Sequence, residues 1–147
     1  MFPVEGVPSI EAACVKLTIR FFRCLDTREH AAAAAMFAPD GVWNRPGGVA
    51  LTGNAEVLAA LEQRPADRST AHLLSNVWAE AADPDHVRVH FYLTLRERIA
   101  AENKPVVFNT GGVLYGTDHF IRLAEGWRIQ SKGTQRVLAA ADTEKSS

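Results

Sequence analysis

Long apolar runs, blocks of basic residues and a secretion signal are all missing from this 147-residue sequence. The longest apolar run, Ala31–Ala38, falls well short of the roughly 20 residues that a membrane-spanning helix needs. The N-terminus has neither the basic start nor the apolar stretch of a secretion signal. Lysine and arginine are spread along a chain of net charge −1. We therefore expect neither a membrane nor a nucleic acid as a partner.

Cysteine is scarce, and both copies lie in one predicted helix. Cys14 and Cys24 are ten residues apart, which is about 15 Å at a helical rise of about 1.5 Å per residue. A disulfide needs Cα atoms within about 7 Å of each other, so these two cannot pair. We expect both to be small buried side chains in a protein of the reducing cytoplasm.

Motifs that bind common cofactors are missing as well. There is no glycine-rich phosphate loop, no Gly-x-Ser-x-Gly elbow and no Cys-x-x-Cys pair. Two of the histidines His72, His90 and His119 could join Asp26 at a metal, but their spacings match no compact ligand motif. The sequence therefore predicts no cofactor and no metal site.

The composition is that of an ordinary globular protein. Apolar residues make up 47% of the chain and charged residues 22%, which leaves enough apolar material for a real core. The length predicts a single domain over residues 1–147, with its core at about residues 9–138. Residues after Ala139 are small and polar, and we expect them to fray.

Helical patterns come first and extended patterns follow. The helical patterns cover residues 10–26, 27–37 and 55–63. Ser9 and Asn54 are the expected N-caps of the first and third helices, and the turn signal at residues 39–41 should end the second. The extended patterns cover residues 42–44, 70–80, 86–98, 106–123 and 127–138.

Turn signals at residues 83–85 and 125–126 predict hairpins between the long strands, and hence an antiparallel sheet. Helices followed by such a meander are typical of an α+β domain. Long antiparallel strands curl. We therefore expect a cone-shaped barrel, in which three N-terminal helices cover a curled antiparallel sheet and leave an open mouth.

Asp26 stands where the first helical pattern predicts an apolar side chain. Val15, Ile19, Phe22 and Asp26 follow one another at helical spacing and share one stripe. A buried carboxylate can act as a base, or it can share a proton with a nearby histidine. The alternative is a capping box, in which Asp26 caps the second helix and Glu29 lies at its third position.

His72 begins a predicted strand on the same face as Leu74, Asn76 and Trp78. A histidine there can form a catalytic pair with Asp26, although a lone histidine in a strand is more often a structural hydrogen-bonding group. For the pair we predict a carboxylate oxygen about 2.6–3.2 Å from an imidazole nitrogen, inside a mostly apolar cavity. We also predict a pKa for His72 above about 6.5, because the carboxylate favours the imidazolium.

Further polar groups could face the same cavity. His90 and Tyr92 share one face of the strand 86–98, which is functional if it turns into the cone and structural if it faces solvent or a second subunit. Asn109 and Tyr115 share a face of the following strand, where Gly116 and nearby glycines indicate a bend or room for a ligand.

The order and spacing of four segments resemble the nuclear transport factor 2-like superfamily, and its SnoaL-like branch in particular. The resemblance extends from about Ile10 to Val137. The segments are residues 22–27 (Phe-Arg-Cys-Leu-Asp-Thr), 36–43 (Met-Phe-Ala-Pro-Asp-Gly-Val-Trp), 70–76 (Thr-Ala-His-Leu-Leu-Ser-Asn) and 126–129 (Gly-Trp-Arg-Ile). The resemblance implies a cone-shaped α+β barrel, a homodimer through the sheet, and a small hydrophobic cyclic or aromatic ligand in the cone.

Two members of that superfamily, scytalone dehydratase and hexachlorocyclohexane dehydrochlorinase, have an Asp and a His at the positions of Asp26 and His72. The resemblance implies that Asp26 and His72 remove a proton during an elimination or isomerisation, without a cofactor. Candidate substrate-binding residues are Trp43, Trp78, His90, Tyr92, Asn109 and Tyr115. Trp43 and Trp78 are candidate pocket walls. Tyr92, Asn109 and Tyr115 are candidates to hold a substrate oxygen.

The sequence also departs from those enzymes. Leu25 stands where scytalone dehydratase has a tyrosine, and residues 95–97 (Leu-Arg-Glu) offer no match for its second catalytic histidine. The catalytic base of ketosteroid isomerase would fall near Arg45, which disfavours that chemistry. Two alternatives of another class stay open. One is a structural protein like the β subunits of aromatic-ring-hydroxylating dioxygenases, and the other is a ligand-binding module without turnover.

Overall fold

The computed structural model describes residues 8–99 and 112–138, and in this part of the chain three helices and six strands form. The helices are α1 (Ile10–Asp26), α2 (His30–Ala35) and α3 (Gly53–Glu62). The strands are β1 (Phe37–Asn44), β2 (Ala50–Thr52), β3 (Arg68–Asp83), β4 (His86–Ile99), β5 (Val113–Leu123) and β6 (Gly126–Leu138). Asn109, the first half of the predicted strand 106–123 and the tail expected to fray lie outside the described residues.

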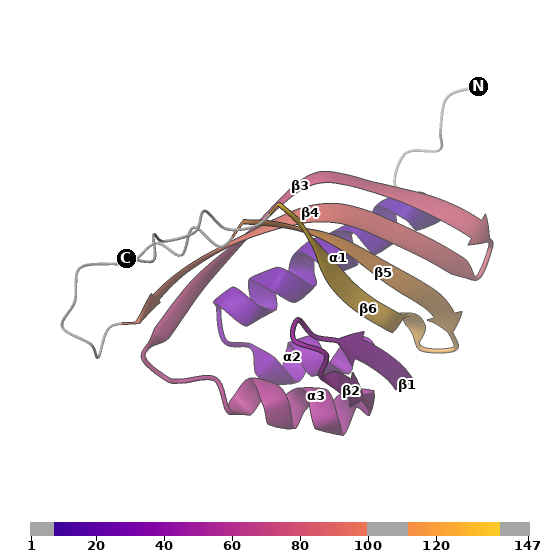
Figure 1. Cartoon of the computed structure of the whole chain (residues 1–147). Helices are drawn as coiled ribbons and strands as arrows, with labels where there is room; N and C mark the ends of the chain where they lie inside the picture. Colours follow the sequence, from indigo (N-terminus) through magenta and orange to yellow (C-terminus); the bar gives the residue numbers. More distant parts are fainter. Residues whose placement is uncertain (1–7, 100–111, 139–147) are drawn as a thin grey trace.

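The strands form one curled sheet in the order β2-β1-β6-β5-β4-β3. Every neighbouring pair is antiparallel except β1 and β6, which run parallel. The α+β fold is therefore confirmed, while the sheet is mixed at one pair. Because β2 and β3 are its outer strands, the sheet is curled but not closed. Figure 1 shows it arching over α1, with α2, α3 and the short strands β1 and β2 beneath.

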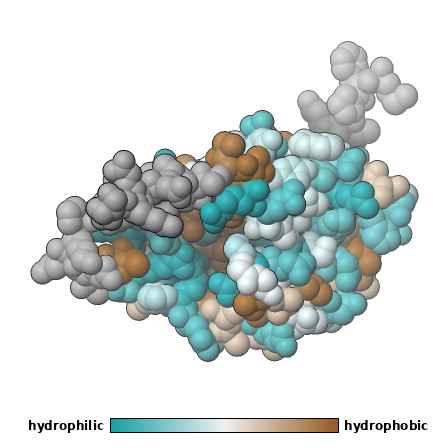
Figure 2. Space-filling view, viewed as in Figure 1, coloured by the Kyte–Doolittle hydropathy of each residue, from teal (hydrophilic) through white to brown (hydrophobic). Residues whose placement is uncertain are grey.

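The core lies between α1 and the concave face of the sheet. Its largest fully buried apolar side chains are those of Phe21, Phe37, Phe91, Phe120 and Ile129. The face seen in Figure 2 is mainly hydrophilic, with smaller apolar patches. None of the helices in the described ranges is both long enough and apolar enough to span a membrane.

Helix ends are the least accurate part of the sequence-based prediction. Ser9 caps α1 as expected, since its hydroxyl accepts a hydrogen bond from the backbone N–H of Ala12 at 3.1 Å. The capping box is wrong: α2 begins only at His30, and its N-cap Glu29 makes no side-chain cap bond. Asn54 is not a cap either, because it lies inside α3. Its side-chain amide donates to the backbone carbonyls of Ala34 and Phe37.

A bulge in β3 changes which side chains face the core. Asn76 has a positive φ of 51°, and the pairing with β4 shifts between Ser75 and Trp78. A bulge adds one residue to a strand and reverses the alternation beyond it. Val77 therefore packs against the core, while Trp78 is 51% exposed on the other face. The prediction that Trp78 shares a face with His72 is wrong for this reason.

Gly116 makes room for a core side chain. A Cβ atom at this position would lie 2.2 Å from Cζ of Phe91, so the phenyl ring packs directly over the glycine. The sequence indicated space for a ligand or a bend here, and the structure fills that space with the Phe91 ring.

Candidate active site

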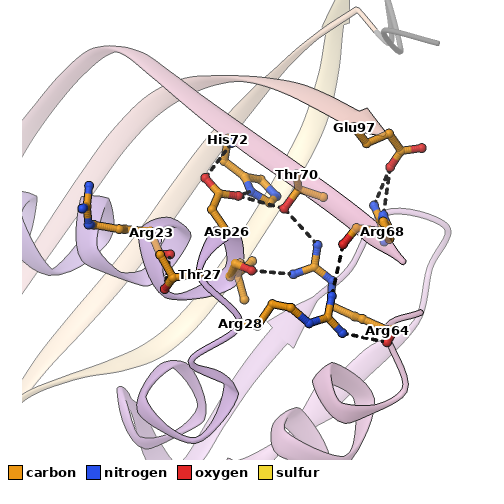
Figure 3. Close-up of polar contacts among 10 residues, drawn as sticks. Arg23, Asp26, Thr27, Arg28, Arg64, Arg68, Thr70, His72 and Glu97 are labelled. Atoms are coloured by element: carbon orange, nitrogen blue, oxygen red, sulfur yellow. Dashed lines mark hydrogen bonds and ion pairs between the residues drawn. The ribbon is translucent and has the colours of Figure 1, made fainter. Parts of the chain in front are cut away.

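Asp26 and His72 are brought together at the junction of α1 and β3. Oδ1 of Asp26 lies 2.5 Å from Nδ1 of His72, and Oδ2 accepts the backbone N–H of His72 at 3.0 Å. Oδ1 also accepts a hydrogen bond from the hydroxyl of Thr70 at 2.9 Å. Figure 3 shows these groups between the last turn of α1 and the start of β3. Asp26 is thus held by β3 and not by the backbone of α2.

The pair borders a cavity of about 380 Å³. Four lining residues are apolar (Ile19, Phe22, Leu74 and Val77) and four are polar (Arg23, Asp26, Thr27 and His72). The Phe22 ring lies against the imidazole, with 5.2 Å between ring centroids. Polar and apolar residues line the cavity in equal number, but apolar atoms supply the larger part of its surface, as we predicted.

Burial leaves the imidazole of His72 neutral near pH 7. The side chain is only 9% exposed, and this burial lowers the pKa of His72 below its usual value. The hydrogen bond and the charge of Asp26 raise that pKa, but they offset only part of the effect of burial, and nearby Arg64 and Arg68 lower it further. The prediction of a raised pKa is wrong because the cost of burying a charged imidazole exceeds the gain from the carboxylate.

The neutral ring fits one tautomer best. A carboxylate accepts hydrogen bonds, so Nδ1 carries the proton toward Asp26 and Nε2 keeps its lone pair. No hydrogen bond to Nε2 is formed by any side chain or backbone group of residues 8–99 and 112–138. Nε2 can therefore accept a proton from a bound molecule.

Two groups around the pair were not singled out from the sequence. Thr70 hydrogen-bonds Asp26, and Nη2 of Arg64 donates to the Thr70 hydroxyl at 3.3 Å. Nη1 of Arg64 donates to the carbonyl of Leu25 at 3.2 Å. A signal for Thr70 did exist, because it precedes His72 by two residues and so shares its face of the strand. Arg64 lies in a loop, where no periodicity predicts the direction of a side chain.

Most of the other predicted substrate contacts lie across the sheet from this pair. Trp78, His90, Tyr92 and Tyr115 form one cluster, in which the Trp78 and His90 ring centroids are 4.5 Å apart and Tyr115 Oη lies 2.7 Å from His90 Nδ1. The residues that alternate with them in β4, such as Phe91, face the core. The structure therefore does not bring these four residues to Asp26 and His72.

Trp43, by contrast, lies on the core side. Its ring packs edge-on against Phe21, with 5.3 Å between centroids, and is tilted against Phe37. It borders neither Asp26 nor His72 in the described cavity. Asn109 is the one predicted contact outside the described residues.

The remaining candidate ligand groups do not converge. Within the two described ranges, no three His, Cys, Asp or Glu side chains are placed to hold a metal ion. Cys14 and Cys24 are both buried and unpaired with each other, as expected. Burial raises the pKa of the Cys14 thiol to about 12, so this thiol is not a nucleophile near neutral pH.

A second charged cluster is buried in the core. Nζ of Lys132 lies 2.9 Å from both carboxylate oxygens of Asp118, and the Thr18 hydroxyl donates to the same carboxylate at 2.8 Å. The ammonium also lies 4.3 Å and 4.2 Å from the ring centroids of Phe21 and Phe22. Burial lowers the pKa of Lys132, and Asp118 opposes that effect.

Comparisons with known proteins agree on the fold. A model of the SnoaL-like domain matches residues 9–132. No curated protein matches the sequence significantly. The protein Aln2 from a Streptomyces species superposes with a TM-score of 0.72 at 21% identity, covering 89% of this chain and 94% of its own.

Two proteins of Novosphingobium aromaticivorans are also similar. One, a proposed scytalone dehydratase, has a TM-score of 0.71 at 18% identity and covers 90% of this chain and 87% of its own. The other, a proposed aromatic ring hydroxylase, has a TM-score of 0.69 at 18% identity and covers 88% of this chain and 91% of its own. At these identities the likeness shows the cystatin-like, nuclear transport factor 2-like fold alone. The domain match spans most of the sequence, so the chain belongs to the SnoaL-like domain family.

Proposed function

We propose that the protein binds a small hydrophobic cyclic or aromatic molecule and acts on it as a cofactor-free lyase, dehydratase or isomerase. The observation that carries the proposal is the contact of 2.5 Å between Asp26 Oδ1 and His72 Nδ1 at a cavity that both residues line, where no described residue hydrogen-bonds Nε2. Family membership and the similarity to a proposed scytalone dehydratase support it.

In the proposed step, Nε2 of His72 takes a proton from a carbon of the bound molecule. The electron pair of that C–H bond then either expels a leaving group from the next carbon or moves a double bond. In an isomerisation the imidazolium returns the proton to a different carbon. Asp26 keeps Nδ1 protonated and stabilises the imidazolium as it forms.

The lowered pKa of His72 restricts the substrate. A weak base removes a carbon-bound proton only when a neighbouring group acidifies that carbon. We therefore expect a ketone or another electron-withdrawing group next to the reacting carbon.

Proton exchange tests this proposal without knowledge of the leaving group. Incubation in D2O with a panel of cyclic and aromatic ketones should place deuterium at one acidified carbon of a ligand, as measured by NMR and mass spectrometry. His72→Gln should abolish the exchange. His86→Gln is the matched control, because His86 forms a similar contact with Asp83, at 2.9 Å, in an exposed hairpin. Binding without exchange would favour a ligand-binding module, and equal exchange by His72→Gln would contradict the role of His72.

We further propose that two copies pair through the outer face of the sheet. Leu73 and Trp78 lie on that face and are 53% and 51% exposed, so a second copy packed there would cover large apolar side chains. Sedimentation should give twice the 16.1 kDa chain mass, and Trp78→Glu should give a monomer. Val49→Glu is the control, since Val49 is 55% exposed in the β1–β2 turn. A monomeric wild-type protein at micromolar concentration would contradict the proposal.

Purification of the protein for sedimentation also tests the alternative of a structural protein like a dioxygenase β subunit. The similarity to a proposed aromatic ring hydroxylase supports this alternative. Co-purification with a larger iron-bearing subunit would favour a β-subunit-like role over a homodimer. The cytoplasmic location and the extent of a single domain over residues 1–147 stay predictions.

A further inference from the structure

A second cavity, of about 540 Å³, lies between α3, the β1–β2 turn and the loop before β3. Arg45, Arg64 and Arg68 line it, and Val49, Leu51 and Ala59 supply apolar walls. None of its lining residues borders the Asp26–His72 cavity. We refer to it as the arginine cleft.

Positive charge in and beside the cleft is only partly neutralised. Arg68 forms an ion pair with Glu97, with Nη2 and Oε2 2.7 Å apart. Arg28 instead donates to three backbone carbonyls in residues 64–68, at 3.1–3.2 Å. Figure 3 shows Arg28 and Arg64 gathered below Thr70. In the described part of the chain, neither Arg28 nor Arg64 forms an ion pair with a carboxylate.

Of the arginines that line the cleft, Arg45 is best placed to meet an anion. Arg64 already donates to the Leu25 carbonyl and the Thr70 hydroxyl, and Arg68 pairs with Glu97. The guanidinium of Arg45 lies 5.5 Å above the Trp43 ring, and no residue of the two described ranges forms an ion pair with it. Burial lowers the pKa of Arg64, and the charges of Arg68 and Arg28 add to that effect, while the charge of Asp26 opposes it. The cleft also contains one carboxylate, Glu56, whose Oε2 accepts the backbone N–H of Thr52 at 2.6 Å.

We propose that the arginine cleft binds the carboxylate of an organic anion with an apolar body. Guanidinium groups offer paired donors that match the two oxygens of a carboxylate. The apolar walls would cover an attached ring or alkyl chain, which an inorganic anion lacks. This inference does not depend on proton abstraction by His72.

Benzoate is the probe, titrated by calorimetry into the full chain, with ionic strength held constant by sodium chloride. We expect saturable binding with one site per chain, weaker binding of inorganic phosphate, and none attributable to chloride. Arg45→Gln should weaken benzoate binding about tenfold, which is the loss of about one charge-assisted hydrogen bond, or 1.4 kcal/mol. Arg20→Gln removes the same charge from the exposed face of α1 and should bind benzoate as the wild type does.

Ala59→Glu is a second variant that places a negative charge on the exposed wall of the cleft and keeps a good helix former in α3. It should abolish benzoate binding. The proposal is overturned if benzoate binds no more tightly than phosphate, or if both Arg45→Gln and Ala59→Glu bind it like the wild type. His72→Gln should still bind benzoate in the cleft, so loss of proton exchange and loss of anion binding are separate results.

Discussion

Replacing Lys132 with methionine is expected to destabilise the folded protein by about 3–5 kcal/mol. The Lys132 and Asp118 side chains are 1% and 0% exposed. Methionine fills much of the same space, so the loss does not arise from a large cavity. It arises because Asp118 would remain in the core as an uncompensated charge, and among the described residues only the Thr18 hydroxyl would still be bonded to it.

Thermal and urea unfolding measure this effect. For a chain of this size, 3–5 kcal/mol lowers the melting temperature by roughly 10 °C. Lys16→Met is the control, because Lys16 is exposed on the same helix as Thr18, and it should change stability by less than about 0.5 kcal/mol.

Removing the Asp118 carboxylate together with Lys132 should restore most of the stability. In the double variant Lys132→Met/Asp118→Leu no charge is left in the core, and Thr18 can turn its hydroxyl to a carbonyl of its own helix. A single variant as stable as the wild type would show that Asp118 is easily neutralised. A double variant no better than the single would show that packing around Phe21 and Phe22, and not charge, dominates.

Elements with strong local patterns were predictable from the sequence. Helix α1 and the long strands β3, β4 and β6 have clear periodicities, and their ends agree with the predictions to within a few residues. The meeting of Asp26 and His72 followed from a carboxylate in an apolar stripe together with the family resemblance. These signals lie within single elements, where spacing alone determines which side chains share a face.

The errors have long-range causes. Asp26 is held by Thr70 and His72, which lie 44 and 46 residues further along the chain, so bonds across the fold override local capping chemistry. The bulge at Asn76 reverses the faces of β3, and a single asparagine in a strand does not reveal it. Lys132 has the spacing of an ordinary strand residue, and only its pairing with Asp118 on β5 explains its burial.

Replacing Asp26 with asparagine is expected to lower the rate of proton abstraction by on the order of 10²–10⁴-fold. Asparagine keeps one acceptor oxygen, and when that oxygen still accepts the His72 backbone N–H, its NH2 group faces Nδ1 of the ring. The introduced amide would therefore favour the tautomer in which Nδ1 accepts and Nε2 carries the proton, and that Nε2 cannot act as a base. The variant should also lower the pKa of His72 further, because the carboxylate raises it in the wild type.

The stability of Asp26→Asn should fall by about 1–3 kcal/mol, since the carboxylate accepts bonds from Thr70, from the His72 backbone and from its ring.

The contribution of His72 to the pH dependence of stability has a definite sign. A folded-state pKa below the unfolded value of about 6.5 means that stability is complete above that pH and decreases as the pH falls toward the folded pKa. In Asp26→Asn, with a lower folded pKa, this loss should continue to more acidic pH.

NMR titration of the imidazole reports the tautomer and the pKa directly, and the deuterium exchange assay reports function. Asp83→Asn is the matched control, because it removes the carboxylate from the exposed His86 pair and should leave exchange unchanged. If Asp26→Asn exchanges protons normally while the His72 tautomer changes, then His72 is not the base. If the tautomer and the pKa stay as in the wild type, then the carboxylate does not control the imidazole, and a structural role for Asp26 at the junction of α1 and β3 becomes the better account.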